Sequence, residues 1–156
     1  MKNFILTFAC IAFVIIIGGG TYEHLTMVPQ WVAAPPVSLS MFQGSYGLNS
    51  GPFWIPIHPL TLVLLTAALI IHRKTPRFRS IATVLIIYVF VLIITFIYFV
   101  PELMAIINTE YSTSIDSDLQ GRAGMWEKLS IARLFVMAAL AYLLLSSLTK
   151  PTIKEA

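Results

Sequence analysis

The sequence predicts an all-α membrane protein that folds as a four-transmembrane-helix up-down bundle. The chain has 156 residues, of which 58% are hydrophobic and only 11% charged, and its mean hydropathy is +0.85. A soluble domain carries about 25% charged residues, so this deficit excludes a water-soluble fold. Four long apolar runs are the second observation, and the distribution of charge between the two sides of the membrane is the third.

The apolar runs predict one membrane domain, residues 1–156, whose partner is the lipid bilayer. Its spans are expected at approximately 4–22, 57–72, 80–100 and 126–148. The first run ends in three glycines, and with its basic start it also has the shape of a secretory signal. Its apolar centre is long for a signal, and its loss would leave an odd number of spans. Cleavage of this run stays open.

The first connection, Thr21–Ile55, is rich in proline, glycine and serine and contains aromatic residues such as Trp31 and Trp54. A connection of this length without secondary structure of its own is usually functional or disordered. Its aromatic residues predict a loop that lies at the membrane interface or a lid that folds over the helix ends.

Prolines mark the ends of the second and third spans. Pro59 suits a first helical turn, and the preceding Pro56 is expected to extend the second span in a non-helical form. Pro101 is expected to kink or end the third span. A polar connection over residues 108–124 then leads to the fourth span.

Charge predicts the orientation of the bundle. One side holds seven of the ten basic residues: Lys2, Arg73, Lys74, Arg77, Arg79, Lys150 and Lys154. The other side holds six of the seven acidic residues: Glu23, Glu102, Glu110, Asp116, Asp118 and Glu127. The positive-inside rule therefore predicts cytoplasmic termini, a long first extracytoplasmic loop and a multi-pass location in the cell membrane, the inner membrane in a bacterium. The basic residues follow this topology and do not indicate nucleic-acid binding.

An arginine at the start of the fourth apolar run needs polar partners, because a guanidinium stays charged and is costly to leave dry in a membrane. This residue, Arg133, shares a helix face with Trp126 and Ser130, which lie seven and three residues before it. The predicted counter-ions, in order of preference, are Glu102, Glu23 and Glu127.

The other three spans also place polar residues at the outward-facing end. Tyr88, Thr95 and Glu102 are spaced by seven and share a face of the third span, while His24 and His58 lie at the outer ends of the first two. Two interpretations follow. These residues either pin the helices together, or they line a polar pocket that opens outward.

Four of these residues are suitable metal ligands by type: Glu23, His24, His58 and Glu102. Adjacent residues point about 100° apart on a helix, and no compact metal-binding motif is present. We therefore predict no metal site and keep these four as weak candidates. The sequence names no cofactor.

Several scattered motifs resemble the anthrone oxygenase-like family of small four-helix membrane proteins. The residues that carry the resemblance are a glycine-rich exit from the first span followed by Tyr22 and Pro29, then Thr95, Pro101 and Glu102, and finally Trp126 separated by six residues from Arg133. The chain has Glu102 where the family often has asparagine, and Ser130 where it often has histidine or asparagine.

The resemblance implies an oxidoreductase that acts on a lipophilic small molecule resembling a phenol or quinol, since fungal members help to oxidise anthrones to anthraquinones. The candidate catalytic residues are Glu102, Arg133 and His58, with Glu102 or His58 as the base. The candidate ligand-binding residues are Glu23, His24, Tyr98, Trp126 and Trp54. The alternative is a non-enzymatic accessory or structural subunit of a membrane complex. A transporter fragment is a weaker third hypothesis.

Overall fold

Four long helices form the molecule in a computed structural model that describes residues 2–151. The long elements are α1 (Lys2–Thr26), α3 (Gly51–Ile71), α4 (Phe78–Ile94), a π-helical segment (Thr95–Phe99) continued by α5 (Val100–Ile107), and α6 (Ser117–Ser146). Short pieces are α2 (Val28–Val32) and the 3₁₀ helices Val37–Phe42 and Ser147–Thr149. The four long helical stretches are each long and apolar enough to cross a membrane, so the predicted number of helices capable of spanning is confirmed.

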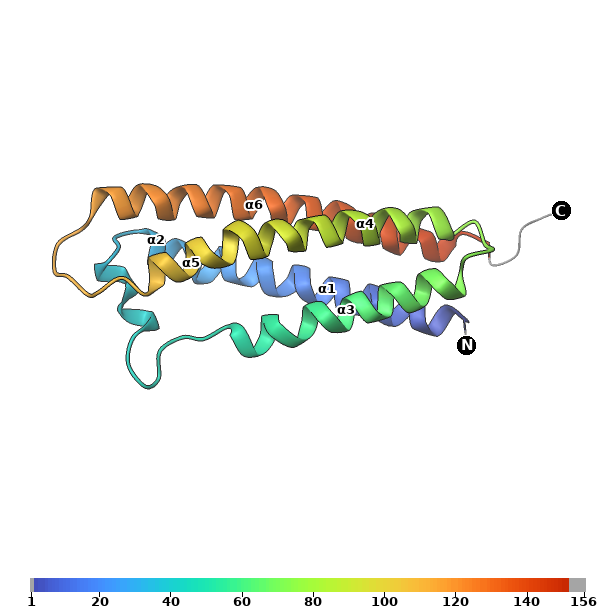
Figure 1. Cartoon of the computed structure of the whole chain (residues 1–156), viewed down its shortest axis with the longest axis horizontal. Coiled ribbons are helices and arrows are strands. Elements are labelled where there is room, and N and C mark those ends of the chain that lie inside the picture. The colour runs from blue at the N-terminus through green and yellow to red at the C-terminus, as the bar shows by residue number, and fades with distance from the viewer. Residues whose placement is uncertain (1, 152–156) are drawn as a thin grey trace.

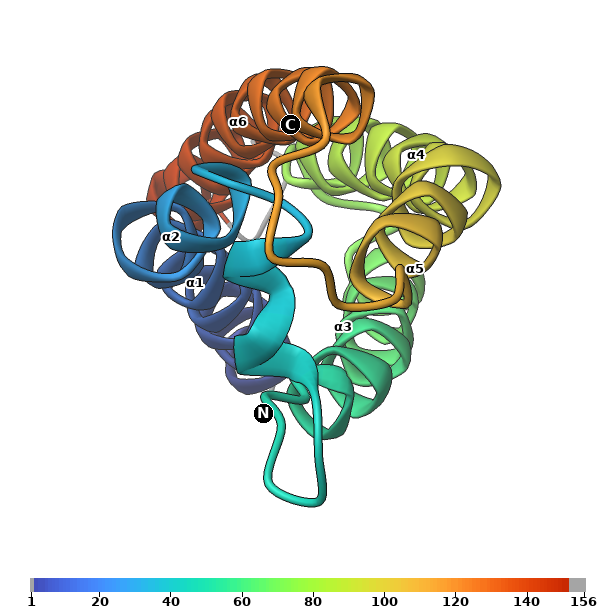
Figure 2. The ribbon, with the colours of Figure 1, turned by 90° about the vertical axis from the view of Figure 1, so that its left-hand side faces the viewer.

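Consecutive long helices run in opposite directions (Figure 1), and the view along the bundle shows them arranged as a ring (Figure 2). Within the ring, α1 contacts α3 and α6, and α4 contacts the same two helices. The start of α1, the short α3–α4 turn and the end of α6 lie at one end, which we call the turn end. The first and third connections lie at the other end, which we call the lid end. Lys154, counted above with the basic side, lies outside the described residues.

The bundle is apolar both inside and outside, as a membrane environment requires. Its central core contains fully buried side chains from all four helices, such as Phe13, Leu65, Tyr88 and Leu144. Large apolar side chains such as Phe135 also cover the outer surface. These exposed apolar residues are consistent with contact with lipid.

Two helices begin earlier than expected. Helix α3 starts at Gly51 and continues through Pro56 and Pro59, so the expected non-helical extension before Ile57 is wrong. Each proline removes one backbone bond, and membrane helices tolerate this loss where neighbouring polar groups or local backbone adjustments satisfy the freed carbonyl. Helix α6 starts at Ser117, within the expected polar connection, because the Asp116 carboxylate caps its first turn.

Pro101 does not end the third span. Backbone pairing widens to the π-helical segment just before it, and the helix then continues as α5 to Ile107. Proline cannot donate the bond that a regular helix expects, and a wider turn accommodates the missing donor. One extra residue is thereby inserted into the helical phase between Thr95 and Glu102.

The first connection folds over the lid end instead of remaining a structureless loop. Trp31 is 2% exposed and packs with Leu39, Phe99 and Trp126 in a second apolar core. Two bonds tie this connection to α6: Gln120 Nε2 donates to the Ala33 carbonyl, and the Asp116 amide donates to the Pro35 carbonyl. Of the two alternatives for this region, folding over the helix ends describes its buried part.

Candidate functional site

Arg133 lies at the centre of a group of polar side chains inside the lid half of the bundle. Its Nη1 donates to Thr95 Oγ1 at 3.1 Å, and its Nη2 donates to Ser130 Oγ at 2.9 Å. The guanidinium carbon lies 4.1 Å from the centroid of the Phe99 ring, within the range of a cation–π contact. Arg133 is therefore held by two neutral hydroxyls and an aromatic face.

Local backbone geometry explains two of these partners. Thr95 and Phe99 are the first and last residues of the π-helical segment, and both meet the same guanidinium. The Thr95 hydroxyl donates to the Val91 carbonyl at 2.8 Å, so its oxygen is free to accept from Arg133. On α6, Ser130 and Arg133 are three residues apart and share a face.

Ser130 connects Arg133 to helix α1. Its hydroxyl oxygen lies 3.0 Å from His24 Nε2, and the side chain is almost fully buried. The Ser130 hydroxyl accepts from Arg133, and it either donates its proton to His24 Nε2 or accepts a second bond from it. A single serine thus joins two polar side chains across two helices.

His24 has one nitrogen without a partner. Its Nδ1 is the one buried side-chain polar atom that lacks a hydrogen bond among the described residues. Since Nε2 is engaged with Ser130, Nδ1 is either an unpaired N–H or an unpaired lone pair, depending on the tautomer. Leaving such an atom unsatisfied costs about 1–3 kcal/mol, so this position favours an additional polar partner.

A second series of contacts runs across α1, α3 and α4. Trp54 Nε1 donates to Glu23 Oε1 at 2.9 Å, and the Trp54 ring stacks on His58 with centroids 5.5 Å apart. His58 Nδ1 lies 2.8 Å from the hydroxyl of Tyr88, which is fully buried. Four aromatic or ionisable side chains are thereby held in fixed orientations.

The two series form one site, which we call the polar cluster: Glu23, His24, Trp54, His58, Tyr88, Thr95, Ser130 and Arg133. Glu23 and His24 are adjacent on α1, so each begins one series. Every long helical stretch contributes to the cluster, as the sequence predicts.

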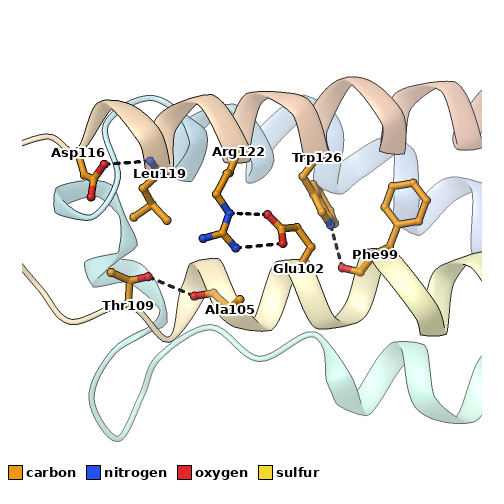
Figure 3. Close-up of polar contacts among 8 residues, drawn as sticks. All are labelled: Phe99, Glu102, Ala105, Thr109, Asp116, Leu119, Arg122 and Trp126. Carbon is orange, nitrogen blue, oxygen red and sulfur yellow. Dashed lines mark hydrogen bonds and ion pairs between the residues drawn. The ribbon is translucent and has the colours of Figure 1, made fainter.

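The predicted counter-ion of Arg133 is wrong. Glu102 accepts from Arg122 through both carboxylate oxygens, at 2.8 and 3.0 Å, on the more exposed flank between α5 and α6 (Figure 3). The spacing of seven from Thr95 predicted a shared face, but the π-helical segment shifts the helical phase before Glu102. Among the described residues, no ion pair joins Arg133 to a carboxylate.

The other two acidic candidates do not replace Glu102. The Glu23 carboxylate accepts from Trp54 and, in the part of the chain that the structure describes, forms no ion pair with the Arg133 guanidinium. Glu127, the third candidate, is half-buried on α6 and is likewise not paired with Arg133.

Trp126 separates the Arg122–Glu102 pair from the polar cluster. Its indole Nε1 donates to the Phe99 carbonyl at 2.9 Å (Figure 3), and its ring lies 5.4 Å from Trp31 and 6.3 Å from His24, centroid to centroid. This tryptophan therefore covers the cluster from the lid side. Tyr98, predicted to bind ligand, packs against the second apolar core beside Phe99.

The weak metal candidates do not come together as ligands. In residues 2–151, no group of three or more histidine, cysteine, aspartate or glutamate side chains is placed to hold a metal ion. Glu102 is engaged with Arg122, and His58 faces Tyr88. The chemistry that these residues offer is hydrogen bonding and proton exchange.

Sequence reasoning missed Phe99 and Arg122. Phe99 follows Thr95 by four residues, and this spacing is the signal that could have identified it as a partner of Arg133. Arg122 lies in the stretch that was expected to be a loop, so no helix face was assigned to it.

Comparisons with known proteins give no relative for this chain. No family model, curated protein or solved structure matches it. The resemblance to the anthrone oxygenase-like family therefore stays a prediction.

Proposed function

We propose that the protein is a multi-pass protein of the cell membrane that binds a lipophilic small molecule with a polar oxygen, of the phenol or quinol type, at the polar cluster. The observation that carries this proposal is the unpaired Nδ1 of His24 near Arg133, whose hydrogen-bond partners among the described residues are two hydroxyls. An oxygen-bearing ligand satisfies both groups, since it can accept from Arg133 and exchange a hydrogen bond with His24.

The cluster lies between helices that are apolar enough to span a membrane, and we propose that the ligand reaches it from the lipid. The Trp126 and Trp54 rings lie beside His24 and His58 and offer flat surfaces for an aromatic ligand. By the positive-inside rule we place this end of the bundle on the extracytoplasmic side.

Oxidoreductase activity on such a molecule is the further step of the proposal. A phenol or quinol must lose a proton when it is oxidised, and an imidazole at this position is a suitable acceptor. Glu102, the first base suggested by the sequence, is engaged with Arg122 on the exposed flank. His58, the other base that the sequence suggests, is hydrogen-bonded to Tyr88 through Nδ1. We therefore take His24, whose Nδ1 has no partner among the described residues, as the base, with Arg133 stabilising the oxygen that becomes negatively charged. Oxidation of a quinol to a quinone releases two protons and two electrons. The protons leave through His24 to water, and the two electrons reduce molecular oxygen, the external oxidant of the proposed step, to hydrogen peroxide.

Intrinsic fluorescence tests binding directly, because all three tryptophans lie in the lid half near the cluster. Detergent-solubilised protein is titrated with duroquinone, a small quinone that quenches tryptophan. We expect a saturable component of quenching that Arg133→Gln and His24→Leu weaken at least tenfold. Arg122→Gln, which removes a nearby arginine outside the cluster, is the matched control and should retain wild-type quenching.

Two results contradict the proposal. Either quenching by duroquinone has no saturable component in the wild type, or the saturable component persists unchanged in folded Arg133→Gln and His24→Leu proteins. Circular dichroism and the unfolding midpoint establish that each variant is folded.

A structural role is the second candidate function. Apart from His24 Nδ1, the buried polar side-chain atoms of the cluster have partners within the bundle, which is what residues that pin helices together require. A non-enzymatic accessory subunit predicts a stable co-purifying protein partner and no saturable quenching.

A further inference from the structure

The turn end of the bundle carries a second site that is independent of the polar cluster. A hollow of about 680 Å³ lies at the α3–α4 turn, lined by Arg73, Lys74, Thr75, Pro76, Phe78 and Arg79. Three of these six residues are basic. The hollow is within the size range of small-molecule sites, about 300–1,000 Å³.

The fourth basic residue of the turn, Arg77, is buried and has a structural role, unlike the three that line the hollow. Arg77 is 4% exposed, and its three nitrogens donate to the Lys150 carbonyl, the Asn3 side chain and the Leu148 carbonyl, at 2.9, 2.9 and 3.0 Å. Lys150 in turn donates to Ser80 Oγ at 2.6 Å. These bonds hold the turn against the end of α6.

The three basic residues that line the hollow have no such role. Arg73, Lys74 and Arg79 are exposed, and within residues 2–151 their side chains make no hydrogen bond or ion pair. The six described carboxylates all belong to the lid half or its connections, so none neutralises this end. Among residues 2–151, therefore, no carboxylate compensates the three positive charges that line the hollow.

We propose that this hollow binds the phosphate of an anionic phospholipid. The turn lies at the ends of two spanning helices, at the depth where lipid headgroups lie. Phe78 is 38% exposed beside the basic residues, and the outer face of α4 continues from it with exposed residues such as Ile86 and Phe90. A phospholipid places its phosphate on the basic side chains and an acyl chain along this apolar face. A soluble phosphate compound would contact only the basic side chains and leave the apolar face uncovered.

Basic clusters next to membrane spans are known to recognise anionic headgroups, and each basic residue near the surface strengthens such binding about fivefold. Loss of two of the three should therefore weaken binding about 25-fold. Arginine contributes directional bonds to phosphate oxygens in addition to its charge.

Native mass spectrometry of the full chain tests this site. The protein is released from mixed micelles that contain equal amounts of phosphatidylglycerol and phosphatidylcholine, and the ratio of retained lipids is measured. The test variant is Arg73→Gln/Lys74→Gln. The matched control is Arg122→Gln/Lys128→Gln, which removes one arginine and one lysine from the exposed surface of α6.

We expect wild type and control to retain phosphatidylglycerol preferentially, and the test variant to lose most of that preference. An equal loss in both variants would indicate a general charge effect and overturns the proposal, as does a preference that survives in the test variant. Circular dichroism confirms folding, which Arg77 should preserve because it is unchanged.

A second arm separates a lipid from a free phosphate. Inorganic phosphate or glycerol 3-phosphate, added at millimolar concentration, should not displace phosphatidylglycerol, because neither carries acyl chains. Displacement by either compound would overturn the assignment to a lipid. None of these outcomes depends on ligand binding at the polar cluster.

Discussion

Ser130→Ala removes the hydroxyl through which α6 reaches α1 in the polar cluster. The hydroxyl oxygen lies 2.9 Å from Arg133 Nη2 and 3.0 Å from His24 Nε2. A bond to a charged group contributes about 1.5–3 kcal/mol in soluble proteins, and a neutral bond about 0.5–1.5 kcal/mol. Bonds between membrane helices are weaker, about 0.6 kcal/mol on average and at most about 1.7. These values are for one bond, and Ser130→Ala removes two. We therefore expect a loss of about 2 kcal/mol in the free energy of unfolding.

Ser147→Ala is the matched control. Ser147 is also buried on the α6 side of the bundle, but its hydroxyl donates within its own chain segment, to the Leu144 carbonyl at 2.6 Å. Its removal leaves no polar side chain of another helix without a partner. We expect the free energy of unfolding to change by less than about 0.5 kcal/mol, because alanine also has the higher helix propensity.

Unfolding in sodium dodecyl sulfate, followed by tryptophan fluorescence and circular dichroism, measures both changes. A double-mutant cycle with His24→Ala then isolates the Ser130–His24 contact, with an expected coupling of at least about 0.5 kcal/mol. Equal stabilities of the two serine variants would refute the reasoning, since it would mean that the hydroxyl in the cluster contributes no more than a hydroxyl bonded within its own segment.

Three other predictions test separate parts of the structure, and two of them come with a control variant. Glu102→Gln should cost less than about 1 kcal/mol in chemical unfolding, because the pair it breaks is solvent-exposed. Gly19→Ala should lower the free energy of unfolding by about 1–3 kcal/mol in the same assay, because a Cβ there would lie 2.6 Å from the Phe53 ring of α3. Gly18→Ala is its control: a Cβ at Gly18 meets nothing within 4 Å, so this change should be neutral or slightly stabilising. Arg77→Gln should lower the thermal midpoint measured by circular dichroism, while Arg73→Gln should leave it unchanged.

Hydropathy was sufficient to predict the four spanning helices, because the cost of an unpaired backbone in lipid leaves few alternatives to a helix. The ends of the helices were harder to predict. Proline normally weakens a helix, yet α3 contains Pro56 and Pro59 and still begins at Gly51. The start of α6 was recognisable in principle, since Asp116 is a preferred capping residue just before it.

The sequence predicted some contacts of the candidate site and missed others, for a physical reason. Contacts within a regular helix follow the spacing of the sequence, so Ser130 was correctly placed on the face of Arg133. The relation of Thr95 to Glu102 depended on an uninterrupted helix between them, and the π-helical segment breaks that relation. A shift of one residue rotates the following side chains by about 100°, which is enough to bring Glu102 to Arg122 instead.

Two arginines of the bundle, Arg77 and Arg133, are buried or half-buried, and comparing them shows why Arg133 indicates a ligand site and Arg77 does not. Within residues 2–151, Arg77 also lacks a carboxylate partner, yet each of its three nitrogens donates to an oxygen of the chain. A missing counter-ion is therefore compatible with a purely structural role. Arg133 differs because only two of its nitrogens have such partners and because the neighbouring His24 keeps an unpaired buried nitrogen. This combined shortage of partners at one place in the membrane is the reason to search for a ligand there and not at Arg77.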